Sequence, residues 1–272
     1  MFSDHHTQGS SKKINALEHT NYDVVYISPH LDDVTFGCAA HIKSQQQLGK
    51  RTLVVTIFTQ GSDDARNPFS MYEPRYEEDR LSMEELSTDY YHSGFSELIF
   101  RSGLSSKTCC LQPRIATSWV YRASCLAPST DYQLADDIYR HLLNIKAWTG
   151  CKWMLGPIGI GFHPDHLLIN RSFQKLKSHA PNDLRISLYH DWGYSCFKIL
   201  RCSRLPPFGR SLKGLRTTEL KIQGESLALK VRACAAYSGQ VKELFGTVDT
   251  LQKWLRADPY ERFLEFLPRE SD

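Results

Sequence analysis

Two short motifs in this sequence carry side chains that could bind a metal ion. The first is SPHLDD at residues 28–33, and the second is HPDH at residues 163–166. Together they offer three histidines and three aspartates: His30, His163, His166, Asp32, Asp33 and Asp165. Two imidazoles and one carboxylate are a usual ligand set of catalytic zinc, with the fourth position left for water. An ion held in this way could activate water for hydrolysis.

The spacing within each motif indicates how the roles could be divided. His30 and Asp33 are three residues apart at a strand-to-helix turn, where both side chains can reach one ion. Asp32 and Asp33 are adjacent, so they point in different directions, and we expect one to coordinate and the other to act as general base. His163 and His166 are also three apart at the start of a helix. One can bind the ion while the other meets charge that develops on the substrate.

Asp165 points away from its neighbouring histidines and is expected to fix the imidazole tautomer of one of them. His41 lies eight residues after Asp33, which is ~12 Å along a helix and too far to join the ion. Each motif alone also fits an ordinary helix start, with aspartate as the N-cap residue or proline in the first turn. Their occurrence together favours a metal site.

The elements that must position these motifs alternate between strand and helix. Apolar runs indicate strands at 23–28, 52–59, 97–101, 152–158 and 184–191. Helical patterns occupy 32–50, 74–94, 130–148, 164–179 and 225–239. This alternation predicts an α/β fold with a doubly wound, mostly parallel, Rossmann-like sheet and a smaller irregular C-terminal extension. Ligands bind beyond the carboxyl ends of the strands in such sheets, and both motifs follow a strand.

Length and composition bound the organisation of the chain. Its 272 residues suit one domain at 22–272 behind a flexible tail at 1–21. The net charge of +3 does not indicate a nucleic-acid partner. The sequence has no secretory pattern and no membrane span, and its eight cysteines contain no CxxC pair, so we expect a cytoplasmic protein without membrane contact. A homo-oligomer is compatible with the sequence.

Two segments are expected to shape the pocket. Residues 103–128 are irregular, and residues 198–216 hold six basic residues and no acidic one. The basic segment fits a solvated insertion, and the alternative is a positively charged lip for an anionic substrate, carried by Arg201, Arg204 and Arg210.

The two motifs resemble the signature of the PIG-L/LmbE family of zinc-dependent N-deacetylases, PHPDDE followed much later by HPDH. The sequence departs from it at Leu31 and Val34, and neither departure removes an expected ligand or the base. Weaker similarities are spread along the chain, so that the resemblance as a whole extends over most of residues 22–267. They are RYEED (75–79), YR (121–122), LYHDWGYS (188–195) and KVRACAAYSGQ (230–240).

The resemblance implies a role for each site residue. His30, Asp33 and His166 would be the metal ligands. Asp32 would be the general base, and His163 would stabilise the oxyanion or protonate the leaving amine, so that Asp32, His163 and Asp165 form the catalytic group. Three residues are implied substrate contacts: Arg75, Arg122 and Asp191. Either arginine could instead form a structural salt bridge, and Asp191 could instead cap a turn.

The implied function is hydrolysis of an N-acetyl or other short N-acyl group from an amino sugar or glycosylated metabolite. One Zn²⁺ per chain is expected, with Fe²⁺ as an alternative. A close rival is an amidase of the same fold that acts on a non-sugar amide. A non-haem iron oxygenase ranks lower, because its two histidines and carboxylate usually lie on an antiparallel β scaffold. A metal-free binding module is disfavoured because the ligands and the base are all present.

Overall fold

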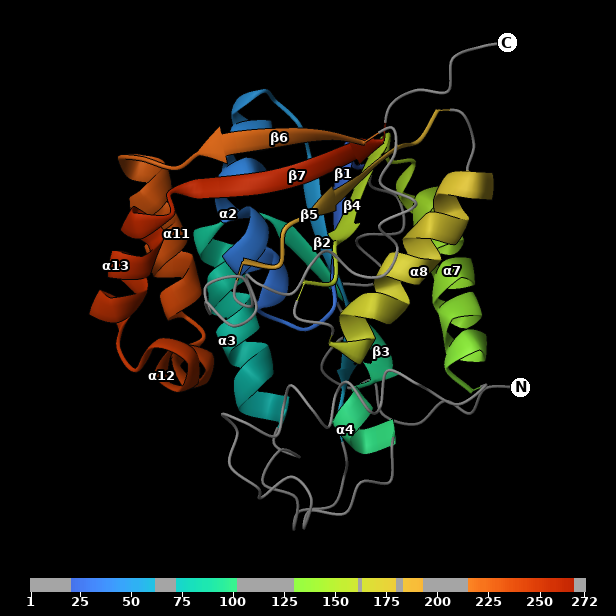
Figure 1. The fold of residues 1–272 in the computed structure, drawn as a ribbon, viewed down its shortest axis with the longest axis horizontal. Helices are drawn as coiled ribbons and strands as arrows, with labels where there is room; N and C mark the ends of the chain where they lie inside the picture. Colours follow the sequence, from blue (N-terminus) through green and yellow to red (C-terminus); the bar gives the residue numbers. More distant parts are fainter. Residues whose placement is uncertain are drawn as a thin grey trace.

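The computed structural model describes residues 21–61, 72–101, 130–160, 163–179, 183–192 and 215–266. These residues form one seven-stranded sheet with helices on both faces (Figure 1). The strands are β1 (Val24–Ser28), β2 (Thr52–Gln60), β3 (Asp89–Ser96), β4 (Trp153–Pro157), β5 (Arg185–Tyr189), β6 (Leu215–Lys221) and β7 (Tyr260–Phe266). The helices are α2 (Asp33–Gln47), α3 (Tyr72–Glu85), α4 (Leu98–Arg101), α7 (Thr130–Thr149), α8 (Pro164–His179), α11 (Glu225–Ala235), α12 (Ser238–Phe245) and α13 (Val248–Ala257).

The strand order confirms a doubly wound, mostly parallel sheet. The order is β3-β2-β1-β4-β5-β7-β6, and β1 to β5 run parallel to one another. From β1 the chain winds outward through β2 to β3, and from β4 it winds the other way to β5. β1 and β4 are therefore neighbours at the point where the winding reverses, which is where ligands bind in open α/β sheets. The two expected metal motifs follow these two strands.

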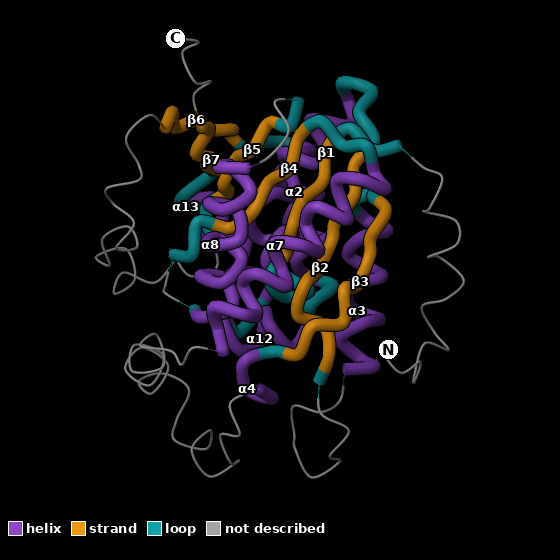
Figure 2. Tube along the Cα trace, turned by 90° about the vertical axis from the view of Figure 1, so that its right-hand side faces the viewer, coloured by secondary structure: helices purple, strands orange, loops and turns teal. Residues whose placement is uncertain are grey.

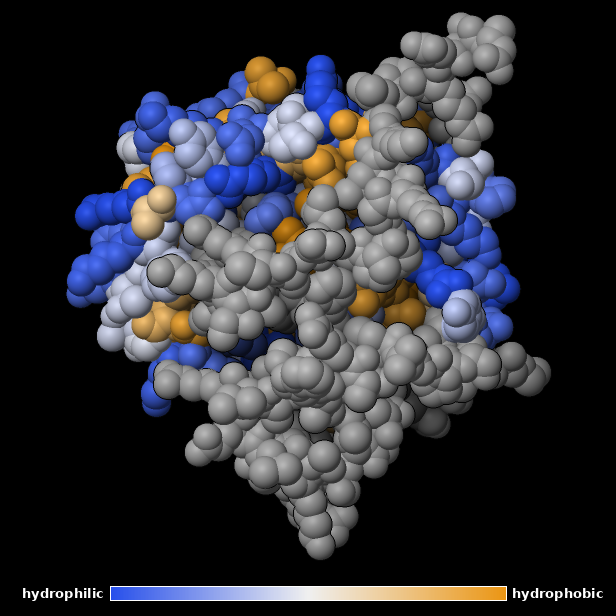
Figure 3. Space-filling view, in the orientation of Figure 1, coloured by the Kyte–Doolittle hydropathy of each residue, from blue (hydrophilic) through white to orange (hydrophobic). Residues whose placement is uncertain are grey.

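The C-terminal part is more regular than the sequence indicates. Strand β7 pairs antiparallel with β5, and β6 pairs antiparallel with β7, so residues 215–266 extend the main sheet and add the three helices α11 to α13. In the view of Figure 3, hydrophilic side chains cover much of the outer surface around α11 and α13, while Leu251 and Leu255 of α13 are buried. The helical pattern thus separates a solvent face from a core face.

Strand β1 is buried along its whole length because both faces of the sheet are covered. Val25 and Ile27 belong to the core on the side of α7 and α8. Val24 and Tyr26 belong to the core on the side of α2, α3 and α11. Figure 2 shows α7 and α8 together in front of the strands. The loop that carries SPHLDD therefore begins at a strand that is buried on both faces.

Two expected elements are corrected by the structure. The helix predicted at 74–94 ends at Glu85, and the strand predicted at 97–101 lies at 89–96 instead. Ser87 has a positive φ of 51°, which breaks the helix. The aromatic residues that follow it favour a strand, and they pair with β2. Residues 98–101 form the short helix α4. The predicted helix at 164–179 is confirmed.

Among the described residues, Cys38, Cys151 and Cys234 are buried free thiols, which matches the expectation of small core side chains. The other cysteines lie outside the described residues: Cys109, Cys110, Cys125, Cys196 and Cys202. No helix in the described ranges is long and apolar enough to cross a membrane.

A buried ion pair ties the C-terminal elements to α2. Lys230 of α11 and Glu261 of β7 are 0% and 1% exposed, and Lys230 Nζ lies 2.8 Å from Glu261 Oε1. The same carboxylate accepts hydrogen bonds from two backbone N–H groups inside α2, those of Ala40 (2.9 Å) and His41 (2.8 Å). Every oxygen of the buried carboxylate is thus satisfied, and α2, which begins at the metal motif, is bonded to β7 and α11.

His41 is the packed helix histidine that the sequence predicts, and it gives a pH dependence of stability. Its Nδ1 lies 2.7 Å from the Tyr26 hydroxyl, and burial together with the charge of Arg185 lowers the pKa of His41 to about 4. The neutral ring is favoured in the folded state, so this stability is fully present above pH 6.5 and is lost as the pH falls toward 4. Between pH 7.5 and pH 4, the free energy of unfolding measured with urea should fall by up to about 3 kcal/mol more in the wild type than in His41→Gln. Equal losses in the two proteins would contradict this account.

Candidate active site

The loop after β1 is held by its own polar side chains. The Ser28 hydroxyl accepts a hydrogen bond from the Val34 N–H (3.1 Å) and donates to the His30 carbonyl (2.5 Å), while Asp33 Oδ2 accepts the His30 N–H (2.9 Å). Asp32 occupies the N-cap position of α2, yet its side chain makes no capping hydrogen bond in the part of the chain that the structure describes. Ser28 caps this helix instead. The ordinary structural explanation for Asp32 therefore does not apply, and its carboxylate is left for another role.

Three donor atoms from the two motifs converge on one place. Asp33 Oδ2 lies 3.2 Å from His30 Nδ1 and 3.2 Å from His166 Nε2. A tetrahedral zinc ion with bonds of about 2.0–2.1 Å holds neighbouring ligand atoms about 3.3 Å apart. The separations to Asp33 fit that requirement. These three residues are the ligand set that the sequence resemblance implies.

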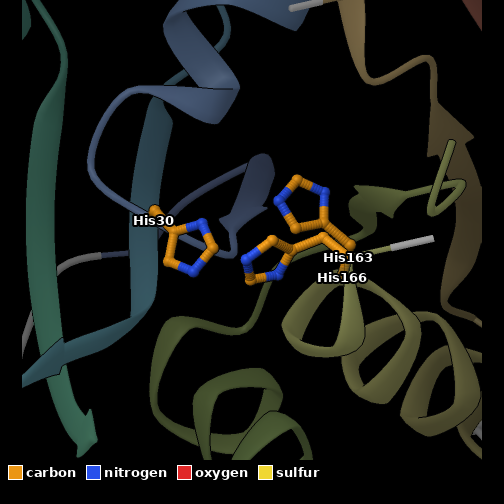
Figure 4. Close-up of side chains that lie close together, drawn as sticks. All are labelled: His30, His163 and His166. Carbon is orange, nitrogen blue, oxygen red and sulfur yellow. The ribbon is translucent and has the colours of Figure 1, made fainter. Parts of the chain in front are cut away.

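The three imidazoles also approach one another. Ligand atoms of His30, His163 and His166 all lie within 4.8 Å of one another, and Figure 4 shows rings from the loop after β1 and from the start of α8 turned toward each other. The centroid of the His163 ring is 4.8 Å from that of His30 and 5.3 Å from that of His166. An ion held by the three histidines is therefore an alternative to the set that contains Asp33. The 3.2 Å donor separations favour the set with Asp33.

A carboxylate contacts the far ring nitrogen of both His30 and His166. His30 Nε2 lies 3.0 Å from Asp165 Oδ2, and the same oxygen accepts the Leu98 N–H at 3.1 Å. His166 Nδ1 lies 2.6 Å from Asp191 Oδ1. Each contact leaves the other ring nitrogen turned toward Asp33. A carboxylate behind a ligating histidine fixes its orientation and raises its basicity, as in many zinc sites.

Asp191 is a buried carboxylate two residues after the end of β5. It is 3% exposed, and its Oδ2 accepts the backbone N–H groups of Gly159 (2.7 Å) and Ile160 (2.9 Å), so both carboxylate oxygens are engaged inside the protein. Asp191 therefore contacts His166 and the backbone, and its implied contact with substrate stays a prediction.

The charges of the site are those of a cation-binding pocket. Burial alone would raise the pKa of Asp33, but His166 and His30 hold it well below its usual range. Burial alone would lower the pKa of His166, but Asp33 and Asp191 raise it to about 9. Protons on imidazoles packed around a carboxylate occupy the place that a divalent cation would take, and metal binding displaces such protons. The donor set present therefore fits a metal ion.

His163 and Asp32 belong to the same two motifs but not to the set of three donor atoms around Asp33. His163 Nδ1 accepts the Asp165 N–H at 3.2 Å, so the neutral ring carries its proton on Nε2. Burial and the charge of His30 lower the pKa of His163 to about 3, so the ring is neutral at pH 7. Burial and the neighbouring Asp33 raise the pKa of Asp32 to about 7. A carboxylate near pKa 7 is suited to proton transfer at neutral pH.

Of the two arginines expected to contact substrate, the structure describes Arg75 and not Arg122. Arg75 on α3 lies close enough to Asp32 to lower its pKa, and its Nη1 donates to Glu97 Oε1 at 2.9 Å. It therefore forms the salt bridge considered as its alternative role, at the edge of the site. Arg122 lies outside the described residues. So do residues 103–128 and the basic segment up to Gly214, including Arg201, Arg204 and Arg210.

Several residues of the site were not found from the sequence. They are Ser28, Glu97 and the backbone of Leu98, together with Tyr237, whose hydroxyl lies 2.7 Å from the Leu31 carbonyl. Ser28 stands immediately before the motif, and a serine at a helix start is a recognisable cap. Tyr237 lies within the KVRACAAYSGQ segment, but that resemblance gives it no role. The contacts of Glu97, Leu98 and Tyr237 join segments far apart in the chain, so no local pattern indicates them.

Comparison with known proteins gives structural likeness only. No family model matches the sequence, and no curated protein matches it. Among solved structures, a deacetylase of the teicoplanin biosynthesis pathway matches with a TM-score of 0.70 at 20% identity, over 92% of this chain and 100% of that one. The zinc-inhibited form of the teicoplanin deacetylase Orf2 matches with 0.70 at 19%, over 92% and 100%.

A third structure comes from a more distant protein. The N,N'-diacetylchitobiose deacetylase of Pyrococcus horikoshii matches with a TM-score of 0.53 at 15% identity, over 98% of this chain and 95% of that one. Similarity at these identities establishes the architecture and not the reaction. The chain thus has the fold of these deacetylases, which confirms at the level of the fold its resemblance to the PIG-L/LmbE deacetylases.

Proposed function

We propose that this protein is a metal-dependent hydrolase that removes an N-acetyl or other short N-acyl group from an amino sugar or a glycosylated metabolite. The observation that carries the proposal is the position of Asp33 Oδ2, 3.2 Å from one nitrogen each of His30 and His166. Both rings are held from behind by carboxylates. Two of the proteins with a similar fold are named as deacetylases, one of the teicoplanin pathway and one of N,N'-diacetylchitobiose.

In the proposed reaction His30, Asp33 and His166 would hold one Zn²⁺, with Fe²⁺ as the alternative. A bound divalent ion would acidify water toward a pKa of about 7 and polarise the amide carbonyl. Asp32 takes the proton of the attacking water. The neutral His163 donates a hydrogen bond from its Nε2–H to the carbonyl oxygen as negative charge develops there, and it keeps this proton. Asp32, then protonated, can return the proton to the leaving amine. Asp165 and Asp191 keep the two histidine ligands in orientation.

A screen for amine release tests this proposal. Metal-replete protein is incubated with N-acetylglucosamine, N,N'-diacetylchitobiose, larger N-acyl glycosides and simple non-sugar amides, with and without oxygen. We expect equal amounts of free amine and carboxylic acid from at least one amino sugar, in both atmospheres, and none from Asp32→Asn. Turnover of the non-sugar amides alone would favour the rival amidase. A strict requirement for oxygen would overturn the hydrolase and favour the iron oxygenase.

A further inference from the structure

A buried hydroxyl holds the peptide that precedes the proposed base. Tyr237 is 2% exposed, and its hydroxyl lies 2.7 Å from the carbonyl oxygen of Leu31, the residue directly before Asp32. The Leu31 side chain is also 2% exposed and packs with the Tyr237 ring in one small apolar cluster. Both the backbone and the side chain of residue 31 are thus fixed by the same tyrosine.

The tyrosine is itself held by α3. Asp79 is 1% exposed, with Oδ1 lying 2.6 Å from the Tyr237 hydroxyl and Oδ2 lying 2.7 Å from His92 Nε2 on β3. The neighbouring Glu78 accepts the Ser238 hydroxyl at 2.7 Å. Two adjacent acidic residues of α3 therefore form hydrogen bonds with the segment that joins α11 to α12. The single hydrogen of Tyr237 is donated to Leu31 or to Asp79 at any one moment.

Tyr237 adds a restraint at residue 31, between the His30 carbonyl, which accepts the Ser28 hydroxyl, and the Asp32 carbonyl, which accepts the Phe36 N–H at 3.0 Å. Leucine stands there, and its φ is not locked as the φ of a proline would be. Asp32 makes no capping hydrogen bond with α2 in the described structure, so its direction depends on how its own backbone is held. A peptide fixed on its carbonyl side sets the Cα–Cβ direction of the next residue.

We propose that Tyr237, held by Asp79, is a positioning residue that keeps the Asp32 carboxylate aimed at the reacting water. The inference rests on the proposed function for its kinetic consequence, although the restraint on the loop can be measured without turnover. Tyr237 does not touch substrate or metal in this account, and it acts only through the Leu31–Asp32 peptide.

Tyr237→Phe removes the hydroxyl and keeps the ring. We expect kcat to fall by about ten-fold, with a change in KM below about two-fold and unchanged metal content. Tyr26→Phe is the matched control, because it also removes a buried tyrosine hydroxyl, but one bonded to His41 in the middle of α2. Its kcat should equal that of the wild type.

A double-mutant cycle separates positioning from general loss of structure. In an Asp32→Asn background, Tyr237→Phe should cause no further fall in kcat, because the group that it positions is already disabled. A full additional ten-fold loss would overturn the proposal, and so would a loss of equal size in Tyr26→Phe.

Hydrogen exchange at residues 30–34 supplies the readout that is independent of turnover. These amides should exchange about ten-fold faster in Tyr237→Phe than in the wild type, and at the wild-type rate in Tyr26→Phe. Unchanged exchange in Tyr237→Phe would refute the positioning role whatever the activity. Faster exchange in a protein that turns over no amide would support the restraint while refuting the proposed function.

Discussion

Replacing Asp32 by asparagine is expected to lower turnover by about 10²–10⁴-fold while the metal content stays that of the wild type. The amide has nearly the size of the carboxylate but cannot accept a proton. Asp32 is not one of the three convergent donors, whereas its neighbour Asp33 lies 3.2 Å from both histidines. Turnover of a deacetylation substrate and zinc content should be measured on the same preparations.

Asp183→Asn is a suitable control for this variant. Asp183 is half exposed and contacts Lys146 and Lys152 far from the site, so its loss should leave turnover unchanged. Full activity of Asp32→Asn would show that Asp32 is not the base. Loss of zinc from Asp32→Asn would show instead that it is a ligand.

The buried pair predicts the largest effect on stability. Lys230→Met should lower the free energy of unfolding by about 3–5 kcal/mol, because it leaves the Glu261 carboxylate buried without its cation. Glu261 would retain only the N–H groups of Ala40 and His41. Chemical denaturation monitored by circular dichroism measures the difference.

The double variant Lys230→Met/Glu261→Gln tests the cause. Removing both charges should cost much less than the sum of the single changes, because no unpaired charge remains in the core. Lys152→Met removes a lysine from an exposed pair with Asp183 and should have no measurable effect. Additive losses in the double variant would show that Lys230 and Glu261 act independently.

Local pattern predicted most of the fold, and it placed the two motifs after strands, where the structure brings His30, Asp33 and His166 together. The helix at 164–179 has the expected bounds because Pro164 starts it and its apolar residues keep helical spacing. The order of strands and helices predicted a parallel sheet with both motifs at the carboxyl ends of strands. The structure adds that these strands, β1 and β4, are neighbours at the switch point. The strand at 89–96 was missed because the helical pattern before it was carried past Ser87, where the backbone turns to positive φ.

Long-range contacts could not be read from the sequence. Asp191 reaches His166 because β5 lies beside β4, and the sequence does not indicate that contact. Tyr237 and Asp79 are 158 residues apart and meet through the packing of α11 against α3. Such pairs depend on how elements stack, and neither residue has a local pattern that indicates its partner.

The metal content of three proteins tests the central claim, that His30, Asp33 and His166 hold one ion. Elemental analysis after metal loading and exhaustive dialysis should give one divalent ion per chain, zinc, in the wild type and in His163→Ala. Asp33→Ala should retain little or none. The alternative set of three histidines predicts the reverse pattern, with metal lost from His163→Ala and kept by Asp33→Ala. That pattern, or full occupancy in a His30→Ala/His166→Ala double variant, would contradict the site described for this protein.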